Sequence, residues 1–242
     1  MNNHPVWQYD EKKQIGKDYG SLAEVEAYDA RHGKFRNVEK ENEEILEKLA
    51  IRPEHVVIEI GTGTGAFAIQ AARRCAQVHA VDVSRTMLAY AGKKASAQGI
   101  TNITFHHGGF LTYAHSGQPV DAVVTNTALH HLPDFWKGVA LQRLSGMLKD
   151  GGQLYLSDVV FEQDGVIGNI GKWIEKLEQA AGPDIRQDVE THIRQEFSTY
   201  DWILDGLLTR AGFAITAKTM HDGVVGRYLC RKGPDGPSGK GA

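Results

Sequence analysis

The sequence has little cysteine and no long apolar run. Its two cysteines, among 242 residues, are Cys75 and Cys230, too few for a disulfide framework or for a zinc site built from cysteines. No stretch has the length and apolar character of a membrane span, and none has the pattern of a secretory signal peptide. We therefore expect a soluble protein of the reducing cytoplasm without a membrane span.

Basic residues are not in excess either. Lys and Arg number 27 against 30 Asp and Glu, which gives a formal net charge of −3, and no basic run is interleaved with aromatic side chains. We therefore expect no nucleic-acid partner. A chain of 242 residues that is 41% hydrophobic suits one α/β domain with a modest insertion, and a homodimer is compatible with this composition.

A short apolar run followed by alternating glycines is the feature around which the chain is organised. Residues 56–60 are apolar and β-branched apart from Glu59, and Gly61, Gly63 and Gly65 follow directly before a helical pattern. This order predicts a buried parallel strand, a tight turn and a helix. Because glycine lacks a Cβ, the backbone can turn sharply and approach a ligand to van der Waals contact.

The glycine spacing differs from that of dinucleotide sites. Those sites carry G-x-G-x-x-G and bind a pyrophosphate at the helix N-terminus, whereas this turn has Gly-x-Gly-x-Gly with Glu59 two residues before it. A carboxylate there is unfavourable for a pyrophosphate and tolerable for a cationic ligand. A second apolar run, 78–82, ends in Asp82, 21 positions after Gly61. An α/β nucleoside site places there the carboxylate that binds both ribose hydroxyls.

Three segments together resemble a known family. Residues 56–65, the Val-Asp-Val-Ser run at 81–84, and the stretch from Asp121 to Asp134 with its His-His-Leu are similar to the class I S-adenosylmethionine-dependent methyltransferases. Within them the chain is most similar to the small-molecule branch that includes the ubiquinone and menaquinone C-methyltransferases. The resemblance implies methyl transfer from S-adenosylmethionine to a small organic acceptor.

The resemblance and the hydrophobic pattern together give an expected architecture. It is a Rossmann-like, seven-stranded, mostly parallel α/β sheet with helices on both faces, a C-terminal antiparallel hairpin and a helical lid. The expected strands are 56–60, 78–82, 102–107, 120–125 and 153–157, with 213–220 and 224–230 as the hairpin.

The chain divides into three expected parts. Residues 1–37 form an N-terminal cap or arm, 38–232 the methyltransferase domain, and 233–242 a flexible tail rich in Gly and Pro. Within the domain, 162–197 carries apolar residues at helical spacing, which predicts two inserted helices that form a lid above the site. A lid that carries Trp173 and Phe197 would suit an organic, partly apolar acceptor.

The resemblance also implies roles for residues at the carboxyl ends of the strands. Asp82 would bind the ribose hydroxyls, and Phe110 and Asn126 would contact the adenine and the methionine part of the cofactor. The expected cofactor contacts are Tyr28, Glu59, Gly61, Thr62, Gly63, Gly65, Asp82, Val83, Met87, Gly109, Phe110 and Asn126.

Three of these residues keep a second interpretation. Glu59 either orients the cofactor's amine or shapes the turn through a hydrogen bond, and Met87 is either core or a contact to the adenine edge. The segment around Tyr28 either folds over the cofactor, as in similar methyltransferases, or packs loosely as an arm.

One position departs from the family pattern. The family usually has Gly-Asp after the third strand, and the Asp accepts a hydrogen bond from the adenine amino group. This sequence has Gly108-Gly109 instead. The adenine contact must then come from the backbone around Gly109 and Phe110, come from a water, or be absent.

Two histidine pairs fall near the expected site. His131, with His130 before it, could contact the acceptor and act as a general base, because imidazole titrates near neutrality; the alternative is that both are structural. His106 and His107 form the second pair. Because adjacent residues on a strand point to opposite faces, we expect no metal site, and we take His131 as the candidate catalytic residue.

Two other functions remain as alternatives. One is a nicotinamide-dependent oxidoreductase, against which the glycine spacing argues. The Tyr-x-x-x-Lys pair of such enzymes is matched only by Tyr90 and Lys94, which fall on a helix in the wrong half of the domain. The other is a non-catalytic cofactor-binding or scaffold subunit, in which the lid is a partner surface.

Overall fold

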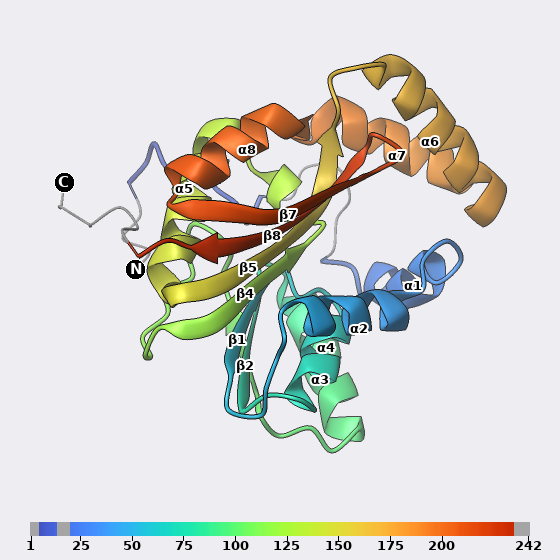
Figure 1. Cartoon of the computed structure of the whole chain (residues 1–242). Helices are drawn as coiled ribbons and strands as arrows, with labels where there is room; N and C mark the ends of the chain where they lie inside the picture. The colour runs from blue at the N-terminus through green and yellow to red at the C-terminus, as the bar shows by residue number, and fades with distance from the viewer. Residues whose placement is uncertain (1–4, 14–19, 235–242) are drawn as a thin grey trace.

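A computed structural model describes residues 5–13 and 20–234 of the chain. Its sheet has the strand order β3-β2-β1-β4-β5-β8-β7 (Figure 1). Neighbouring strands from β3 to β5 are parallel, and β8 runs antiparallel to both β5 and β7. The strands are β1 Val56–Ile60, β2 Gln77–Asp82, β3 Ile103–His107, β4 Val120–Asn126, β5 Leu148–Phe161, β7 Phe213–His221 and β8 Val225–Lys232.

This arrangement confirms the expected Rossmann-like sheet with its antiparallel hairpin. It adds a two-residue strand, β6 Thr199–Tyr200, which pairs with the end of β5 outside the seven-stranded path. Residues 235–242, expected to be a flexible tail, lie outside the described residues.

Alternating side chains of the strands bury on opposite faces of the sheet. Ile58 and Val123 join the core on the face covered by α5 (Asp134–Met147) and α8 (Asp201–Arg210). Val57 and Val124 join the core on the face of α2 (Val38–Lys48) and α3 (Ala66–Ala72). Figure 1 shows α4 (Arg85–Ala97) on the same side as α3. The central strands β1 and β4 are therefore buried on both faces, which explains their near-continuous apolar residues.

The strand order reverses beside β1, which lies between β2 and β4. In open α/β sheets, ligands bind outside the carboxyl ends of the strands at such a reversal. Gly61, Asp82, Asn126 and Ser157 come to this rim, and β5 continues past it to Phe161.

The segment expected as a lid contains α6 (Val166–Ala181) and α7 (Asp184–Gln195). Apolar side chains of both helices, among them Val166, Trp173 and Ile193, pack on Val159 and Phe161 at the end of β5. The protruding end of β5 therefore carries the lid (Figure 1). No helix in the part of the chain that the structure describes is both long and apolar enough to span a bilayer.

The N-terminal helix α1 (Leu22–His32) is attached to the other side of the site. Asp29 accepts hydrogen bonds from Thr64 Oγ1 at 2.6 Å and from Lys94 Nζ at 2.6 Å, and Val25 is fully buried. These contacts hold α1 against the start of α3 and the last turn of α4, across from the lid helices (Figure 1).

Candidate active site

A cavity of about 810 Å³ lies between the rim of the sheet, α1 and the lid. Its volume falls in the range of roughly 300–1,000 Å³ that is usual for small-molecule sites. The expected site residues that line it are Tyr28, Gly61, Gly63, Asp82, Val83, Met87, Gly109, Phe110, Asn126 and His131.

The glycine turn is tied to the end of β2. The Gly61 amide donates to Val81 O at 2.9 Å, and the Gly63 amide donates to Asp82 Oδ2 at 2.8 Å. Gly61 has a φ of +80°, and a Cβ there would lie 2.5 Å from the Cβ of Ala128. Position 61 therefore requires glycine both for its backbone conformation and for the close approach of the next loop.

Three expected contacts lie behind the turn and do not line the cavity. Glu59 is buried and accepts a hydrogen bond from Thr62 Oγ1 at 2.5 Å, and burial raises the pKa of its carboxyl to about 8. A Cβ at Gly65 would lie 2.9 Å from the Cβ of Ala91. These residues shape the turn and let α4 pack closely against it.

Asp82 presents a fixed carboxylate at the cavity wall. Its Oδ1 accepts from the Ser84 amide at 2.8 Å, so each oxygen holds one backbone amide. The Asp82 side chain is buried, and this burial raises its pKa above the ordinary value. Ser84 in turn caps α4 by accepting from the Met87 amide at 3.2 Å. Met87 and Val83 form the adjacent wall, so Met87 serves both the core and the cavity.

The end of β4 contributes a residue that the sequence did not suggest. Thr127 has a φ of +55°, a conformation that is unusual for a β-branched residue and is concentrated at functional sites. Its amide donates to Ser157 O at 2.7 Å, and its Oγ1 donates to Asn126 Oδ1 at 3.0 Å. Both Asn126 and Thr127 line the cavity.

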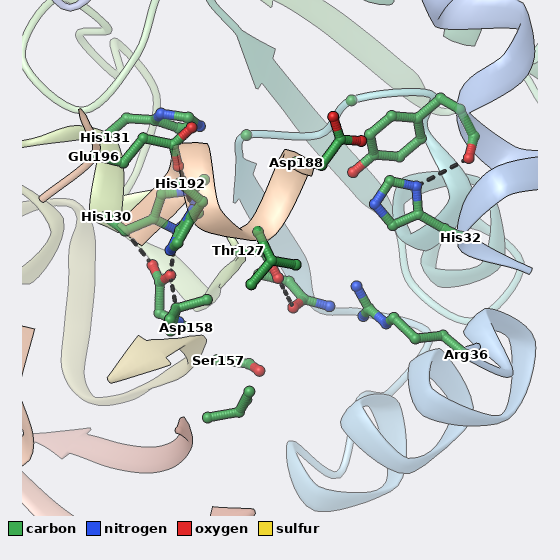
Figure 2. A pocket seen from close by; sticks show the side chains of 18 of the residues that line it. His32, Arg36, Thr127, His130, His131, Ser157, Asp158, Asp188, His192 and Glu196 are labelled. Atoms are coloured by element: carbon green, nitrogen blue, oxygen red, sulfur yellow. Dashed lines mark hydrogen bonds and ion pairs between the residues drawn. The ribbon is translucent and has the colours of Figure 1, made fainter. Parts of the chain in front are cut away.

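Helix α1 supplies the opposite wall. The rings of Tyr28 and His32 lie 4.0 Å apart, and His32 Nδ1 hydrogen-bonds the Tyr28 carbonyl at 2.9 Å. Burial raises the pKa of Tyr28. Figure 2 shows His32 and Arg36 on the side of the pocket away from His130, His131 and His192. Arg36 is paired with Glu41 at 2.6 Å.

A buried bridge joins the rim to the lid (Figure 2). His130 lies in the short 3-10 helix η1 (Leu129–His131). Its Nδ1 is 2.5 Å from Asp158 Oδ1, and its Nε2 is 3.1 Å from Glu196 Oε2, which also contacts the His192 ring. Burial opposes a charge on His130, but Asp158 and then Glu196 outweigh it and raise its pKa to about 9. His130 in turn holds the pKa of both carboxyls below their ordinary range despite their burial.

This bridge is a hydrogen-bonded ion pair by its geometry. The ligand-type atoms of His130, His192 and Glu196 lie within 4.8 Å of one another, and the Glu196 oxygen directly contacts both rings. The second histidine pair is elsewhere: His106 Nε2 is 3.0 Å from His79 Nδ1, and neither His106 nor His107 lines the cavity. The sequence argument did not foresee that lid residues would join His130.

His131 lines the cavity beside this bridge. Its carbonyl accepts from the Tyr9 hydroxyl at 3.2 Å, and its ring lies 4.3 Å from that of His130. Burial, and then the adjacent His130 charge, lower the pKa of His131 to about 4. The imidazole is therefore neutral at physiological pH and can accept a hydrogen bond or donate one.

Known methyltransferases are similar to this chain in sequence. Residues 57–152 match the methyltransferase domain. An uncharacterized methyltransferase of Geobacillus kaustophilus is 29% identical over 190 residues, which cover 78% of this chain and 82% of the relative. The chain is therefore similar in sequence to methyltransferases, in line with the S-adenosylmethionine-dependent enzyme expected from the sequence.

Solved structures share the fold of this chain. The magnesium protoporphyrin IX methyltransferase of Synechocystis, crystallised with S-adenosylmethionine, has a TM-score of 0.64 at 15% identity, over 94% of this chain and 100% of that one. A cyclase has a TM-score of 0.63 at 16% identity, over 81% of this chain and 80% of that one. Because the fold also serves a cyclase, the acceptor has to be argued from the site itself.

Proposed function

We propose that this methyltransferase binds S-adenosylmethionine at the rim and transfers its methyl group to a small organic acceptor held under the lid. The carrying observation is the Asp82 carboxylate, which two backbone amides fix at the cavity wall beside the glycine turn. A carboxylate with both oxygens positioned in this way can accept hydrogen bonds from two neighbouring hydroxyls, as a ribose presents.

The remaining wall residues fit the other parts of the cofactor. Val83, Met87 and Phe110 supply an apolar slot beside Asp82 for a flat base, and Gly61 and Asn126 lie on the side toward α1 for the methionine part. Tyr28 closes that side. When bound, S-adenosylmethionine supplies a methyl group that is already activated for transfer. The protein's task is to orient the acceptor and to exclude water.

The acceptor side of the cavity favours a partly apolar molecule. Trp173, Leu177, Ile185 and Val189 of the lid line it. The charged residues near them are paired, as in the Lys176–Asp222 bridge at 2.6 Å. This composition supports an acceptor of the kind used by the small-molecule branch, including the ubiquinone and menaquinone C-methyltransferases.

His131 is proposed to orient the acceptor through a hydrogen bond. A base with a pKa near 4 removes protons poorly, because catalytic bases work best when their pKa lies near the working pH. We expect His131→Ala to raise KM and to lower kcat by about tenfold or less, since loss of a general base costs roughly 10²–10⁴-fold. Steady-state kinetics measure both constants. A loss of kcat beyond a hundredfold, measured at saturating substrate, would instead make His131 a general base.

Calorimetric titration tests the proposed function. We expect the wild-type protein to bind S-adenosylmethionine and S-adenosylhomocysteine but not NADH, and to form S-adenosylhomocysteine when supplied with an acceptor mixture of small aromatic and quinone compounds. A folded protein that binds neither sulfur nucleoside would overturn the proposal. Tight binding without turnover on any acceptor would favour the scaffold alternative.

A further inference from the structure

We propose that Glu11, on the N-terminal arm, is the carboxylate that recognises the amino group of the cofactor's adenine. This inference rests on the function proposed above. It assigns a specificity-determining role to a residue 46 positions before the matched methyltransferase domain begins at residue 57.

The Glu11 carboxylate occupies the space of the side chain that Gly109 lacks. A Cβ at position 109 would lie 2.5 Å from Glu11 Oε2, 2.7 Å from Glu11 Cδ and 2.9 Å from Val83 Cγ1, so Glu11 makes the two closest contacts. Gly109 does not have the positive φ of the turn glycines Gly61 and Gly63, so its backbone does not demand glycine. The absent side chain is explained by the space that Glu11 needs.

The loop after β3 holds this carboxylate firmly. The Leu111 amide donates to Oε1 at 3.1 Å and to Oε2 at 2.9 Å, and Thr112 Oγ1 donates to Oε1 at 2.6 Å. Thr112 Oγ1 also accepts from the Gly109 amide at 3.0 Å, so the loop is folded around the glutamate. Oε1 thus accepts two hydrogen bonds from the loop and Oε2 accepts one, and Oε2 is the oxygen nearest position 109.

The position of Glu11 fits the polar edge of a purine. Glu11 lines the same cavity as Asp82, and Val83, Met87 and Phe110 form the wall between them. With the ribose on Asp82, a base in this apolar slot extends toward Gly109 and meets Glu11. A carboxylate only accepts hydrogen bonds, so it attracts an amino group and repels a carbonyl oxygen at the same place. The pocket should therefore select adenine against hypoxanthine.

The alternative is that Glu11 merely anchors the arm. Base selectivity separates the two roles, because an anchor has no reason to distinguish an amino group from a carbonyl. The probes are S-adenosylhomocysteine and S-inosylhomocysteine. Their bases differ at C6, an amino group against a carbonyl, and at the neighbouring N1, which carries a hydrogen only in hypoxanthine. Both are titrated by calorimetry into the full-length protein. The variants are Glu11→Gln, Glu11→Ala, Gly109→Asp and the double variant Glu11→Ala/Gly109→Asp. Asp10→Asn, at an exposed neighbouring position on the arm, is the matched control.

We expect the wild type and Asp10→Asn to prefer the adenine compound by at least about 30-fold, as hydrogen bonds to charged groups allow. Glu11→Gln should reduce the preference to a few-fold, because an amide can donate to the carbonyl. Glu11→Ala should bind S-adenosylhomocysteine about tenfold more weakly or worse. Gly109→Asp alone should also bind poorly, because its side chain collides with Glu11. The double variant should recover the preference and part of the affinity, because only the 2.9 Å contact with Val83 Cγ1 remains to be relieved.

Unchanged selectivity in Glu11→Gln and Glu11→Ala, with a lowered Tm, would overturn the inference and leave Glu11 as an anchor. A wild type that binds neither nucleoside would overturn the proposed function itself. Wild-type binding with equal affinity for both nucleosides would overturn only the role of Glu11.

Discussion

Replacing Asp82 with alanine is expected to weaken S-adenosylhomocysteine binding by at least about a hundredfold. The carboxylate can accept from both ribose hydroxyls, and hydrogen bonds to a charged group are worth roughly 1.5–3 kcal/mol each. Two of them correspond to a factor of ~10² or more in Kd. Alanine also releases the amides of Gly63 and Ser84, which the carboxylate holds at 2.8 Å each, so the turn loses its fixed form. Calorimetric titration measures the change.

A second carboxylate provides the control. Asp121 accepts from the Val56 amide at 2.8 Å and pairs with Lys149 at 2.7 Å, at the opposite end of the sheet from the cavity. The Asp121→Ala variant should lose stability but keep its affinity for the nucleoside, because the Asp121 side chain contacts Val56 and Lys149 at the starts of β1 and β5. If Asp82→Ala remains folded and binds within threefold of wild type, the rim is not the nucleoside site.

Replacing His130 with alanine is expected to destabilise the protein by roughly 3–5 kcal/mol, the usual cost of removing one partner from a buried ion pair. The side chains of Asp158 and Glu196 are 3% and 8% exposed, so both charges would remain buried without a cation between them. The lid would also lose one of its links to the rim, since Glu196 follows α7 directly, although the Phe197 amide would still donate to the carbonyl of residue 130. Urea denaturation followed by tryptophan fluorescence measures the free energy of unfolding. Glu178→Gln, which removes an exposed lid ion pair with Arg186, should differ little from wild type.

The same bridge predicts how stability varies with pH. The pKa of His130 is raised to about 9 in the folded protein, against about 6.5 for an unperturbed histidine. Its contribution is therefore complete below the unfolded value and disappears as the pH rises through about 9. The lowered pKa values of Asp158 and Glu196 act at the other end, where their contribution is lost as the pH falls. The wild type should lose stability between pH 7 and 10 by an amount that His130→Ala does not lose. Parallel curves for the two proteins over that range would contradict this assignment.

Local patterns were sufficient to predict the strands and the turn. The run 56–60 is β1 to the residue, because its β-branched side chains and the following glycines leave few alternatives. The Ser84 cap and the hairpin also follow from neighbours in the sequence. Strand β5 is longer than the expected 153–157. Its first residue, Leu148, pairs with Val120 of β4, and its last four residues pair with β8 and β6, elements formed some 40 to 70 residues later.

The contacts that complete the site could not be predicted, because they join distant segments. Glu11 lies 100 residues from the Leu111 amide that it accepts from, and His130 meets Glu196 across the lid. From the sequence, Gly109 indicates only that the usual Asp of the family is absent. Nothing in the neighbouring sequence shows that another segment fills that space. The positive φ of Thr127 could not be predicted either, because it accompanies a hydrogen bond from the Thr127 amide to the carbonyl of Ser157, on another strand.

The arm between Tyr9 and Glu11 has a consequence for turnover. Tyr9 holds the His131 carbonyl and packs edge-on against Phe197 at the end of the lid, while Glu11 sits in the loop after β3. One short segment thus touches both the base end of the cavity and the lid. We expect S-adenosylhomocysteine to leave only as fast as this segment detaches, so that the segment limits product release and with it the catalytic rate. Its three residues lie outside the methyltransferase match over 57–152.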